Sequence, residues 1–403
     1  MTASSVESSA KPERSRDLPA LTGMRFLAAL AVFLCHAVFP LTPGNQTPAV
    51  PYSDPTLTEN LIWFFSPSGT IGLSFFFILS GFVITWSSRP GQRTTAYLRR
   101  RLVKVFPNHV VTWALAMLLF AGAYTPLFGL PNLFLVNTYS SNPEYWGGAN
   151  MPAWSLTVEM LFYLLFPLLI IPIRRIADSR LWLWAGAAVA GMAAICVVTL
   201  WLIPDAPRYP GEALSMPQFW FSYMFPPARL MEFIFGMILA QIVMRGRWPR
   251  IGLAPVLVLL VIGYAAALTV PSPFMLFLVT AVPFGLAIGT YASRNLDGVR
   301  TVMGSRPMVW LGNVSFGFFM TQGVVLFWLR PTVIGEASYG LLGGTVLLIG
   351  LIAINIVAGW LLFKLVEQPT MRHWSRSKKP VATVPQVPVG AVEQEVPSPK
   401  VPV

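Results

Sequence analysis

Charged side chains are scarce in this chain of 403 residues. Asp, Glu, Lys and Arg together make up 11% of the sequence, whereas hydrophobic residues make up 55%. A soluble domain carries about 25% charged residues, so too few polar groups are present to cover a surface that faces water. The composition therefore argues against a soluble globular protein and indicates lipid as the main solvent.

Cysteine is also rare. The two cysteines, Cys35 and Cys196, both lie inside apolar runs, so we do not expect a disulfide framework. Neither has neighbours at the spacing of metal ligands, so we predict no metal site. We interpret both as packing residues, and we expect no tightly bound cofactor.

The net charge of +12 raises the question of nucleic-acid binding. The basic residues stand in short clusters between long apolar runs, and no nucleic-acid recognition motif accompanies them. We therefore expect no nucleic-acid partner. In a membrane protein such clusters set the orientation of the spans instead.

Long apolar runs dominate what the sequence does contain. A membrane-spanning helix needs about 20 apolar residues, and ten stretches qualify as candidates. They are residues 21–40, 68–87, 105–122, 153–173, 181–203, 219–244, 251–269, 272–291, 309–329 and 341–364. The sequence therefore predicts an all-α fold, a polytopic transmembrane helical bundle of about ten spans in the cell membrane.

The positions of Lys and Arg predict the orientation of these spans. With the N-terminus in the cytoplasm, 24 of the 28 Lys and Arg residues fall in inner segments, and two, Arg208 and Arg330, fall in outer loops. Inner loops of membrane proteins are enriched in these residues. An odd number of spans would place the basic C-terminal tail outside, so we expect both termini in the cytoplasm.

The same pattern divides the chain into three regions. Residues 1–18 form a polar cytoplasmic segment, residues 19–374 the transmembrane domain, and residues 375–403 a cytoplasmic tail rich in Pro, Val and Lys. The tail lacks helical periodicity, so we predict that it is disordered. The two longest outer loops, 41–67 and 123–152, are long enough to shape a pocket for an acceptor.

Few ionisable residues lie within the spans, and each is a candidate functional residue because a charge in lipid is unfavourable. They are Arg25 and His36 in the first span, Glu159 in the fourth, and Arg229 with Glu232 in the sixth. Arg25 and His36 share one face of a helix and are about 16 Å apart along its axis. This polar stripe suits a path that crosses much of the membrane.

The fourth span enters the membrane from the outer side. Because Glu159 is near its start, we expect Glu159 at the depth of His36. A carboxylate can orient an imidazole, which is the kind of base that a hydroxyl needs to attack a carbonyl. Structural alternatives stay open. His36 can simply anchor the outer interface, and Arg25 can extend to the inner one. Glu159 can pair with Arg229, or Arg229 can pair with Glu232 within its own helix.

A basic run, Arg99–Arg101 with Lys104, lies on the cytoplasmic side. It can serve to orient the protein, or it can hold the phosphates of a cytosolic nucleotide donor, and the two roles are compatible. The remaining histidines, His109 and His373, also fall on this side, and we expect both to be structural.

Six short motifs occur in order along the chain. They are Arg25 with His36; Gly69 and Gly72 followed by Phe75-Phe76 and Ser80-Gly81-Phe82; Arg100-Arg101 with Lys104 and Pro107; Trp154-Ser155-Leu156 with Glu159; Arg229 with Glu232, Phe233 and Gly236; and Glu367-Gln368-Pro369. In this order and spacing the chain resembles the membrane acyltransferase-3 family, which includes bacterial O-acetylases of cell-surface sugars and macrolide acyltransferases. The resemblance covers about residues 19–374.

The resemblance implies an integral membrane O-acyltransferase. Its donor would be acyl-CoA, with acetyl the expected group, and its acceptor a hydroxyl of a sugar or glycosylated molecule. It implies His36 and Glu159 as catalytic residues and Arg25 as a donor-binding residue. The further donor-binding residues would be Arg100, Arg101 and Lys104, and the supporting residues Trp154, Ser155, Arg229, Glu232 and Gln322.

The chain departs from the family pattern at two positions. The family often has a histidine in the ninth helix where this sequence has Gln322, and a tyrosine where it has His109. Gln322 can form hydrogen bonds but cannot titrate, so a proton-transfer role at this position is in question.

Two other functions compete with acyl transfer. A transporter or flippase of a lipid-linked sugar also needs polar residues near the middle of the membrane. A structural or assembly role is the third hypothesis. His36 discriminates among them, since catalysis requires this residue and transport can survive its loss.

Overall fold

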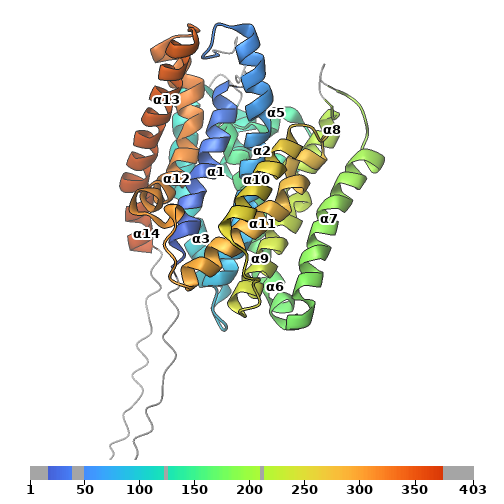
Figure 1. Ribbon diagram of the computed structural model, residues 1–403. Helices are drawn as coiled ribbons and strands as arrows, with labels where there is room; N and C mark the ends of the chain where they lie inside the picture. The colour runs from blue at the N-terminus through green and yellow to red at the C-terminus, as the bar shows by residue number, and fades with distance from the viewer. Residues whose placement is uncertain (1–16, 39–49, 122–125, 209–212, 375–403) are drawn as a thin grey trace, which may run out of the picture.

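Helices make up almost all of the computed structural model, which describes residues 17–38, 50–121, 126–208 and 213–374. These residues contain no β-strand, and the long helices lie side by side in a bundle (Figure 1). The predicted all-α helical bundle is therefore confirmed. The predicted cytoplasmic segment, apart from residues 17 and 18, and the predicted disordered tail 375–403 lie outside the described residues.

Nine helical segments of the described chain are long and apolar enough to cross a membrane. Their main helices are α1 (Pro19–Val38), α2 (Pro55–Ser87), α3 (Thr94–Leu119), α6 (Trp154–Arg175), α7 (Leu181–Leu202), α9 (Leu230–Met244), α11 (Phe274–Leu296), α12 (Arg306–Val324) and α13 (Leu341–Leu362). Each coincides with one of the ten predicted spans. The protein is therefore a multi-pass membrane protein.

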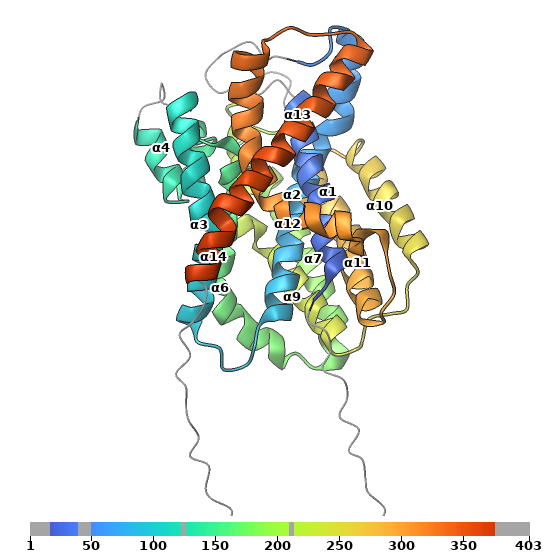
Figure 2. The ribbon, with the colours of Figure 1, turned by 90° about the vertical axis from the view of Figure 1, so that its left-hand side faces the viewer.

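The remaining predicted span, 251–269, is the shorter helix α10 (Leu253–Ala267), which has 15 residues. At 1.5 Å per residue this helix is about 22 Å long, less than the hydrocarbon thickness of about 30 Å. It lies beside α11 at the edge of the bundle (Figure 2). The sequence overestimated its helical length because the apolar run continues past Ala267 into the turn that precedes α11.

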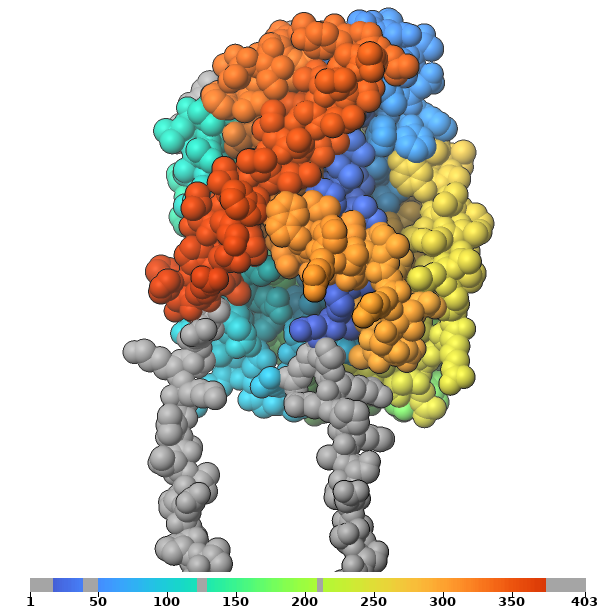
Figure 3. Space-filling view, turned by 60° about the vertical axis from the view of Figure 1, so that its left-hand side comes forward, coloured from blue at the N-terminus to red at the C-terminus, as the bar shows by residue number. Residues whose placement is uncertain are grey.

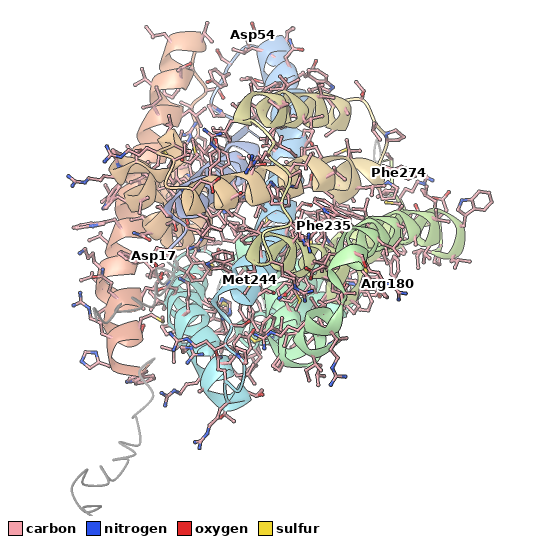
Figure 4. All side chains as sticks on the ribbon, turned by 60° about the horizontal axis from the view of Figure 1, so that its bottom comes forward. Asp17, Asp54, Arg180, Phe235, Met244 and Phe274 are labelled. Carbon is pink, nitrogen blue, oxygen red and sulfur yellow. The ribbon has the colours of Figure 1, made fainter. Side chains whose placement is uncertain are left out.

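The ends of the helices alternate between the two ends of the bundle. Asp54 caps the start of α2. Figure 4 places it far from three residues at other helix ends: Asp17 before α1, Arg180 before α7 and Met244 at the end of α9. The helix α14 (Gln368–Trp374) continues α13 across the outside of the bundle toward the end where α1 begins (Figure 3). With α10 counted beside the nine longer segments, this arrangement agrees with an even number of crossings.

Peripheral helices expose apolar side chains, as a lipid-facing surface requires. Leu183 and Trp201 of α7 are 69% and 82% exposed, Val261 of α10 is 69% exposed, and Leu342 of α13 is 79% exposed. On a protein in water, apolar surface on this scale would promote association. Here it marks the face that contacts hydrocarbon.

The central helices approach one another closely where glycine replaces a larger side chain. A Cβ on Gly312 of α12 would collide with the carbonyl of Thr22 in α1, and one on Gly236 of α9 would collide with the carbonyl of Ile78 in α2. Small residues permit such backbone contact between membrane helices. The contact at Gly312 fixes α1 against α12, and these two helices carry His36 and Gln322.

The segment 126–153, most of which belongs to the predicted outer loop 123–152, is folded into short helices. It folds into α4 (Pro126–Leu133), η2 (Asn137–Tyr139), α5 (Pro143–Trp146) and η3 (Met151–Ala153). Four of its polar residues are buried: Asn132, Asn137, Thr138 and Asn150 are at most 1% exposed. Irregular backbone at membrane depth is tolerated where protein surrounds it. The segment therefore inserts into the bundle, and α6 starts from a buried position.

Long-range hydrogen bonds hold this inserted segment. The indole Nε1 of Trp220 donates to the carbonyl of Thr138 at 2.9 Å, and Asn150 Nδ2 donates to the carbonyl of Met320 at 3.1 Å. Trp220 lies in the segment before α9, and Met320 lies in α12. Both contacts therefore join distant parts of the chain. Local sequence gives no sign of these contacts, so the packing of this segment was not predicted.

Candidate functional site

A polar chamber lies among five of the central helices. Its volume is about 160 Å³, and α1, α2, α3, α6 and α12 contribute its walls. Its charged and polar lining residues are Arg25, Ser80, Arg101, Lys104, Ser155, Glu159, Tyr163 and Ser315. Arg25, Arg101 and Glu159 are distant from one another in the sequence and face the same cavity.

The chamber is rich in positive charge. Arg25 lies six residues into α1 and Arg101 seven residues into α3, so both are about 10 Å from the helix ends predicted to face the cytoplasm. Lys104 joins them from the next turn of α3. Three cations lie near two carboxylates, Glu159 in the chamber wall and Glu367 beside Lys104, which leaves a net positive cavity suited to an anionic ligand.

Glu367 holds Lys104 in place. Lys104 Nζ lies 3.5 Å from Glu367 Oε1, and Asn108 Nδ2 donates to Glu367 Oε2 at 2.9 Å. Glu367 is 5% exposed and belongs to the π-helical turn η9 (Phe363–Glu367) that follows α13. In the sequence Glu367 stands out only as part of a motif, and its contact with the basic wall was not predicted.

Glu159 faces the chamber and is bound within its own helix. Tyr163 Oη donates to Glu159 Oε2 at 2.7 Å. The Arg101 guanidinium lies 5.9 Å from the centre of the Tyr163 ring and 5.7 Å from that of Tyr97, distances at which a cation attracts an aromatic face. Glu159, Tyr163 and Arg101 thus form one connected group on the wall shared by α3 and α6.

Arg100 differs from its neighbours. It is absent from the lining of the chamber, although Arg101 and Lys104 both contribute to it. Adjacent residues on a helix point about 100° apart, which accounts for the separation of Arg100 from Arg101. Within the basic motif, the geometry therefore favours Arg101 and Lys104 as ligands of a molecule in the chamber.

His36 lies near the opposite end of α1 and contacts α12. Its Nδ1 is 3.2 Å from Oε1 of Gln322, and its ring centre is 6.4 Å from that of Phe327. Gln322 is fully buried, and its Nε2 donates to the carbonyl of Phe319 at 2.9 Å. His36 itself is half-buried. His36 and the buried Gln322 therefore form a hydrogen-bonded pair between α1 and α12.

The predicted contact between Glu159 and His36 is not among the hydrogen bonds of the described residues. Glu159 binds Tyr163, and His36 binds Gln322. The prediction rested on depth along the helices alone, and depth does not determine which helix faces meet. Glu159 shares the chamber with Arg25 instead of lying beside His36.

Phe319 links the chamber to the His36–Gln322 pair. Phe76 and Phe319 both line the chamber, and their ring centres are 6.1 Å apart in an edge-on arrangement. Phe319 is one turn before Gln322 and accepts its hydrogen bond. The hydrogen bond from Gln322 to the carbonyl of Phe319 therefore connects the chamber wall to the His36–Gln322 pair.

Arg229 and Glu232 form a buried pair at the start of α9. Arg229 Nε and Nη2 lie 2.6 Å and 3.0 Å from the carboxylate oxygens of Glu232, and Nη2 also donates to Ser74 Oγ at 3.1 Å. The Arg229 guanidinium lies about 5 Å from the rings of Phe77 and Phe277. The intrahelical pairing considered for these two residues is therefore what the structure shows.

The two other supporting residues of α6 have different surroundings. Ser155 lines the chamber and donates its Oγ hydrogen to the carbonyl of Pro152 at 3.2 Å. Trp154 packs against Tyr223, with ring centres 4.7 Å apart. Ser155 therefore belongs to the site itself, whereas Trp154 connects α6 to the segment that carries Arg229.

The remaining histidines lie in different environments. His109 is buried in α3, and its Nε2 lies 2.9 Å from the carbonyl of Asn132. His373 is exposed in α14, and its Nδ1 lies 2.8 Å from the carbonyl of Pro369. Neither lines the chamber, in agreement with the structural roles expected for them.

The structure is therefore that of an integral membrane protein with a cationic chamber among its helices. His36 lies further along α1, one of the helices that line the chamber. The chain belongs to the membrane acyltransferase-3 family, because the family's sequence profile, described as an acyltransferase domain, matches residues 18–364. It is therefore an acyltransferase, as the motifs indicated.

Individual relatives agree with this assignment. The chain is 36% identical over 388 residues to the acyltransferase MdmB of Streptomyces mycarofaciens, an alignment that covers 93% of this chain and 96% of that protein. It is 20% identical over 356 residues to the peptidoglycan O-acetyltransferase OatA of Listeria monocytogenes, covering 78% of this chain and 50% of that protein. No solved structure matches the chain.

Proposed function

We propose that this membrane acyltransferase moves an acyl group, with acetyl expected, from acyl-CoA to a hydroxyl of a sugar or a glycosylated acceptor. The observation that supports this most directly is the polar chamber, in which Arg25, Arg101 and Lys104 converge. Acyl-CoA carries several phosphates at one end and its thioester at the other. A site for it needs cations at one end and a base at the other.

The cations of the chamber would bind the donor's phosphates. Arginine forms paired hydrogen bonds with phosphate oxygens, and lysine binds them as a point charge. Arg25 and Arg101 lie close to the predicted cytoplasmic ends of their helices, the side from which a cytosolic donor would enter. In our proposal the phosphates stay near this end, and the acyl arm extends toward Phe76 and Phe319.

His36 would act as the general base at the far end of that path. In the proposed step, the acceptor hydroxyl gives its proton to the imidazole while its oxygen bonds to the thioester carbonyl carbon. The carbon–sulfur bond then breaks, and the imidazolium passes this proton to the leaving thiolate. General-base assistance of this kind contributes about 10²- to 10⁴-fold to a rate.

Glu159 has a revised part in this proposal. Its hydrogen bond from Tyr163 and its position beside Arg101 support a role in arranging the cations of the chamber. A carboxylate there limits the repulsion between Arg25, Arg101 and Lys104 before the donor binds. We therefore propose that Glu159 affects donor binding more than it affects proton transfer by His36.

The acceptor would approach from the opposite side of the cell membrane. The relatives support two acceptor classes, since one is named a peptidoglycan O-acetyltransferase and the resemblance also extends to macrolide acyltransferases. Cell-envelope glycans and glycosylated macrolide-type metabolites both present sugar hydroxyls. We propose a sugar hydroxyl as the shared chemistry, and the plasma membrane as the location.

A panel of acyl-CoA thioesters tests this function. The purified protein is given each thioester, and release of free CoA is measured with and without glycan and macrolide acceptors. Host glycans and secreted metabolites are then analysed by mass for an added acyl group. Acceptor-dependent CoA release supports the proposal. Translocation of a lipid-linked sugar without any acyl transfer would favour the transporter or flippase instead.

A further inference from the structure

We propose that Gln322 is the positioning residue that fixes the tautomer of His36, so that Nδ1 carries the hydrogen and Nε2 is free to accept a proton. This inference rests on the proposed function only for the consequence that Nε2 is the catalytic atom. The tautomer itself follows from hydrogen-bond geometry and can be measured without any enzyme assay.

The orientation of the Gln322 amide is determined by its second partner. Gln322 Nε2 lies 2.9 Å from the backbone carbonyl of Phe319. A carbonyl oxygen can only accept a hydrogen bond, so the group facing it must be the amide NH₂. Turning the amide over would bring two acceptor oxygens together in a buried position, which is unfavourable.

The tautomer of His36 follows from that orientation. With its NH₂ turned to Phe319, Gln322 presents Oε1 to Nδ1 of His36 at 3.2 Å. The amide oxygen can only accept, so Nδ1 must carry the hydrogen. A neutral imidazole has one N–H, and Nε2 is consequently left with a free lone pair.

The surrounding packing keeps the two residues in register. Gln322 is fully buried, and the Phe318 ring of α12 lies 5.4 Å from that of Phe26 and 5.3 Å from that of Phe33 in α1. The close backbone contact at Gly312 joins the same two helices. Because α1 and α12 are held along their length, the hydrogen bond does not depend on mobile side chains.

Other ionisable groups near this end of α1 have partners elsewhere or face solvent. On α1 itself, Cys35 Sγ donates to the carbonyl of Ser66. Around α2, Asp54 and Glu59 are exposed. On η8 (Val325–Ile334), the buried Arg330 donates through Nη2 to the carbonyl of Ala337, while its Nε and Nη1 have no hydrogen-bond partner among the described residues. The exposed Glu336 and Tyr339 follow it. Within the described chain, Gln322 is the hydrogen-bond partner recorded for the imidazole.

A neutral amide has a chemical consequence that a carboxylate would not have. A carboxylate on Nδ1 would fix the same tautomer and would also stabilise the protonated imidazolium. The amide fixes the tautomer and leaves the imidazolium without a counter-charge. The proton that Nε2 takes from the acceptor hydroxyl is therefore readily passed on to the leaving thiolate. Gln322 thus positions the base and takes no proton itself.

Histidine ¹⁵N spectra test the tautomer directly. The chain has three histidines, so full-length protein labelled only in histidine gives few signals, and His36→Asn assigns the one of interest. We expect His36 to be protonated at Nδ1 in the native protein and to become a mixture of tautomers in Gln322→Met. A His36 signal protonated at Nε2 in the native protein would overturn the inference, whatever the activity.

Kinetic variants test the consequence. Gln322→Met should lower kcat by about 10- to 100-fold, as loss of a histidine-orienting partner typically does, with little change in KM for acyl-CoA. Gln322→Glu should restore much of kcat and move the acidic limb of the pH–rate profile to higher pH, because the carboxylate stabilises the imidazolium.

Thr321→Val is the matched control for these variants. Thr321 is a buried neighbour on α12 that donates to Asn355 Oδ1 at 2.9 Å. Its substitution should reduce stability without moving the pH profile. Unchanged kcat in Gln322→Met together with an unshifted profile in Gln322→Glu would show that Gln322 has a packing role only.

Discussion

Lys104 Nζ lies 3.5 Å from the buried carboxylate of Glu367, a residue 263 positions later in the chain. The contact joins the basic wall of the polar chamber to the π-helical turn after α13. Asn108, one turn further along α3, binds the other carboxylate oxygen at 2.9 Å. The C-terminal end of the membrane domain therefore sets the position of a cation in the proposed donor site.

Substitution of Glu367 should destabilise the protein. Glu367→Ala removes the partner of the buried Asn108 side chain, a loss of about 1–3 kcal/mol, whereas Glu367→Gln retains an acceptor for Asn108 and should lose less. Thermal unfolding of the purified variants measures the effect. Lys364→Ala, an exposed position on the same turn, serves as control. Equal unfolding temperatures for all three variants would contradict the structural role of this contact.

The donor site should depend on the cations that line the chamber. Arg25→Ala and Arg101→Ala should each raise the KM for acyl-CoA by about 10- to 100-fold, the effect of losing one charge-assisted hydrogen bond. Their effect on the KM of the acceptor should be smaller. Steady-state kinetics with both substrates varied measures the difference.

Arg100→Ala provides the matched control for the donor site, because Arg100 belongs to the same basic motif but does not line the chamber. It should change the KM for acyl-CoA much less than Arg101→Ala. An equal effect of all three substitutions would indicate a general loss of positive charge, and unchanged donor affinity in Arg25→Ala and Arg101→Ala would leave the cluster with a role in orientation only.

The predicted topology can be measured in the intact chain. With Cys35 and Cys196 replaced, single cysteines at Asp205 and Asp297 report the outer and inner sides of the bundle. A maleimide that cannot cross the membrane should label the cysteine at 205 in whole cells, and the one at 297 only after lysis. Labelling in the reverse order would show that the distribution of Lys and Arg was misinterpreted.

The helices of the bundle were predictable because apolar length is a local property. Each of the nine spanning segments coincides with a run that is visible in the sequence, and the conversion of apolar length into helix follows from the need to satisfy backbone hydrogen bonds in lipid. Arg25, Arg101 and Lys104 could be singled out on similar grounds, since isolated cations near apolar runs are conspicuous.

The relations between these residues were not predictable, because they depend on contacts between distant segments. Gln322 meets His36 across 286 positions, and nothing near either residue indicates the other. Glu159 was placed beside His36 from depth alone, whereas in the structure it lines the chamber with Arg25. The contacts of the preceding segment 126–153 with Trp220 and with the carbonyl of Met320 also join distant parts of the chain.

The central claim is that His36 is the base for acyl transfer to a hydroxyl. The most direct test is the turnover of purified His36→Ala with acyl-CoA and an acceptor, alongside its unfolding temperature and its affinity for acyl-CoA. We predict a loss of about 10²- to 10⁴-fold in turnover, with folding and donor binding close to those of the native protein. Turnover near the native value in His36→Ala would contradict the account and exclude the first helix as the site of catalysis.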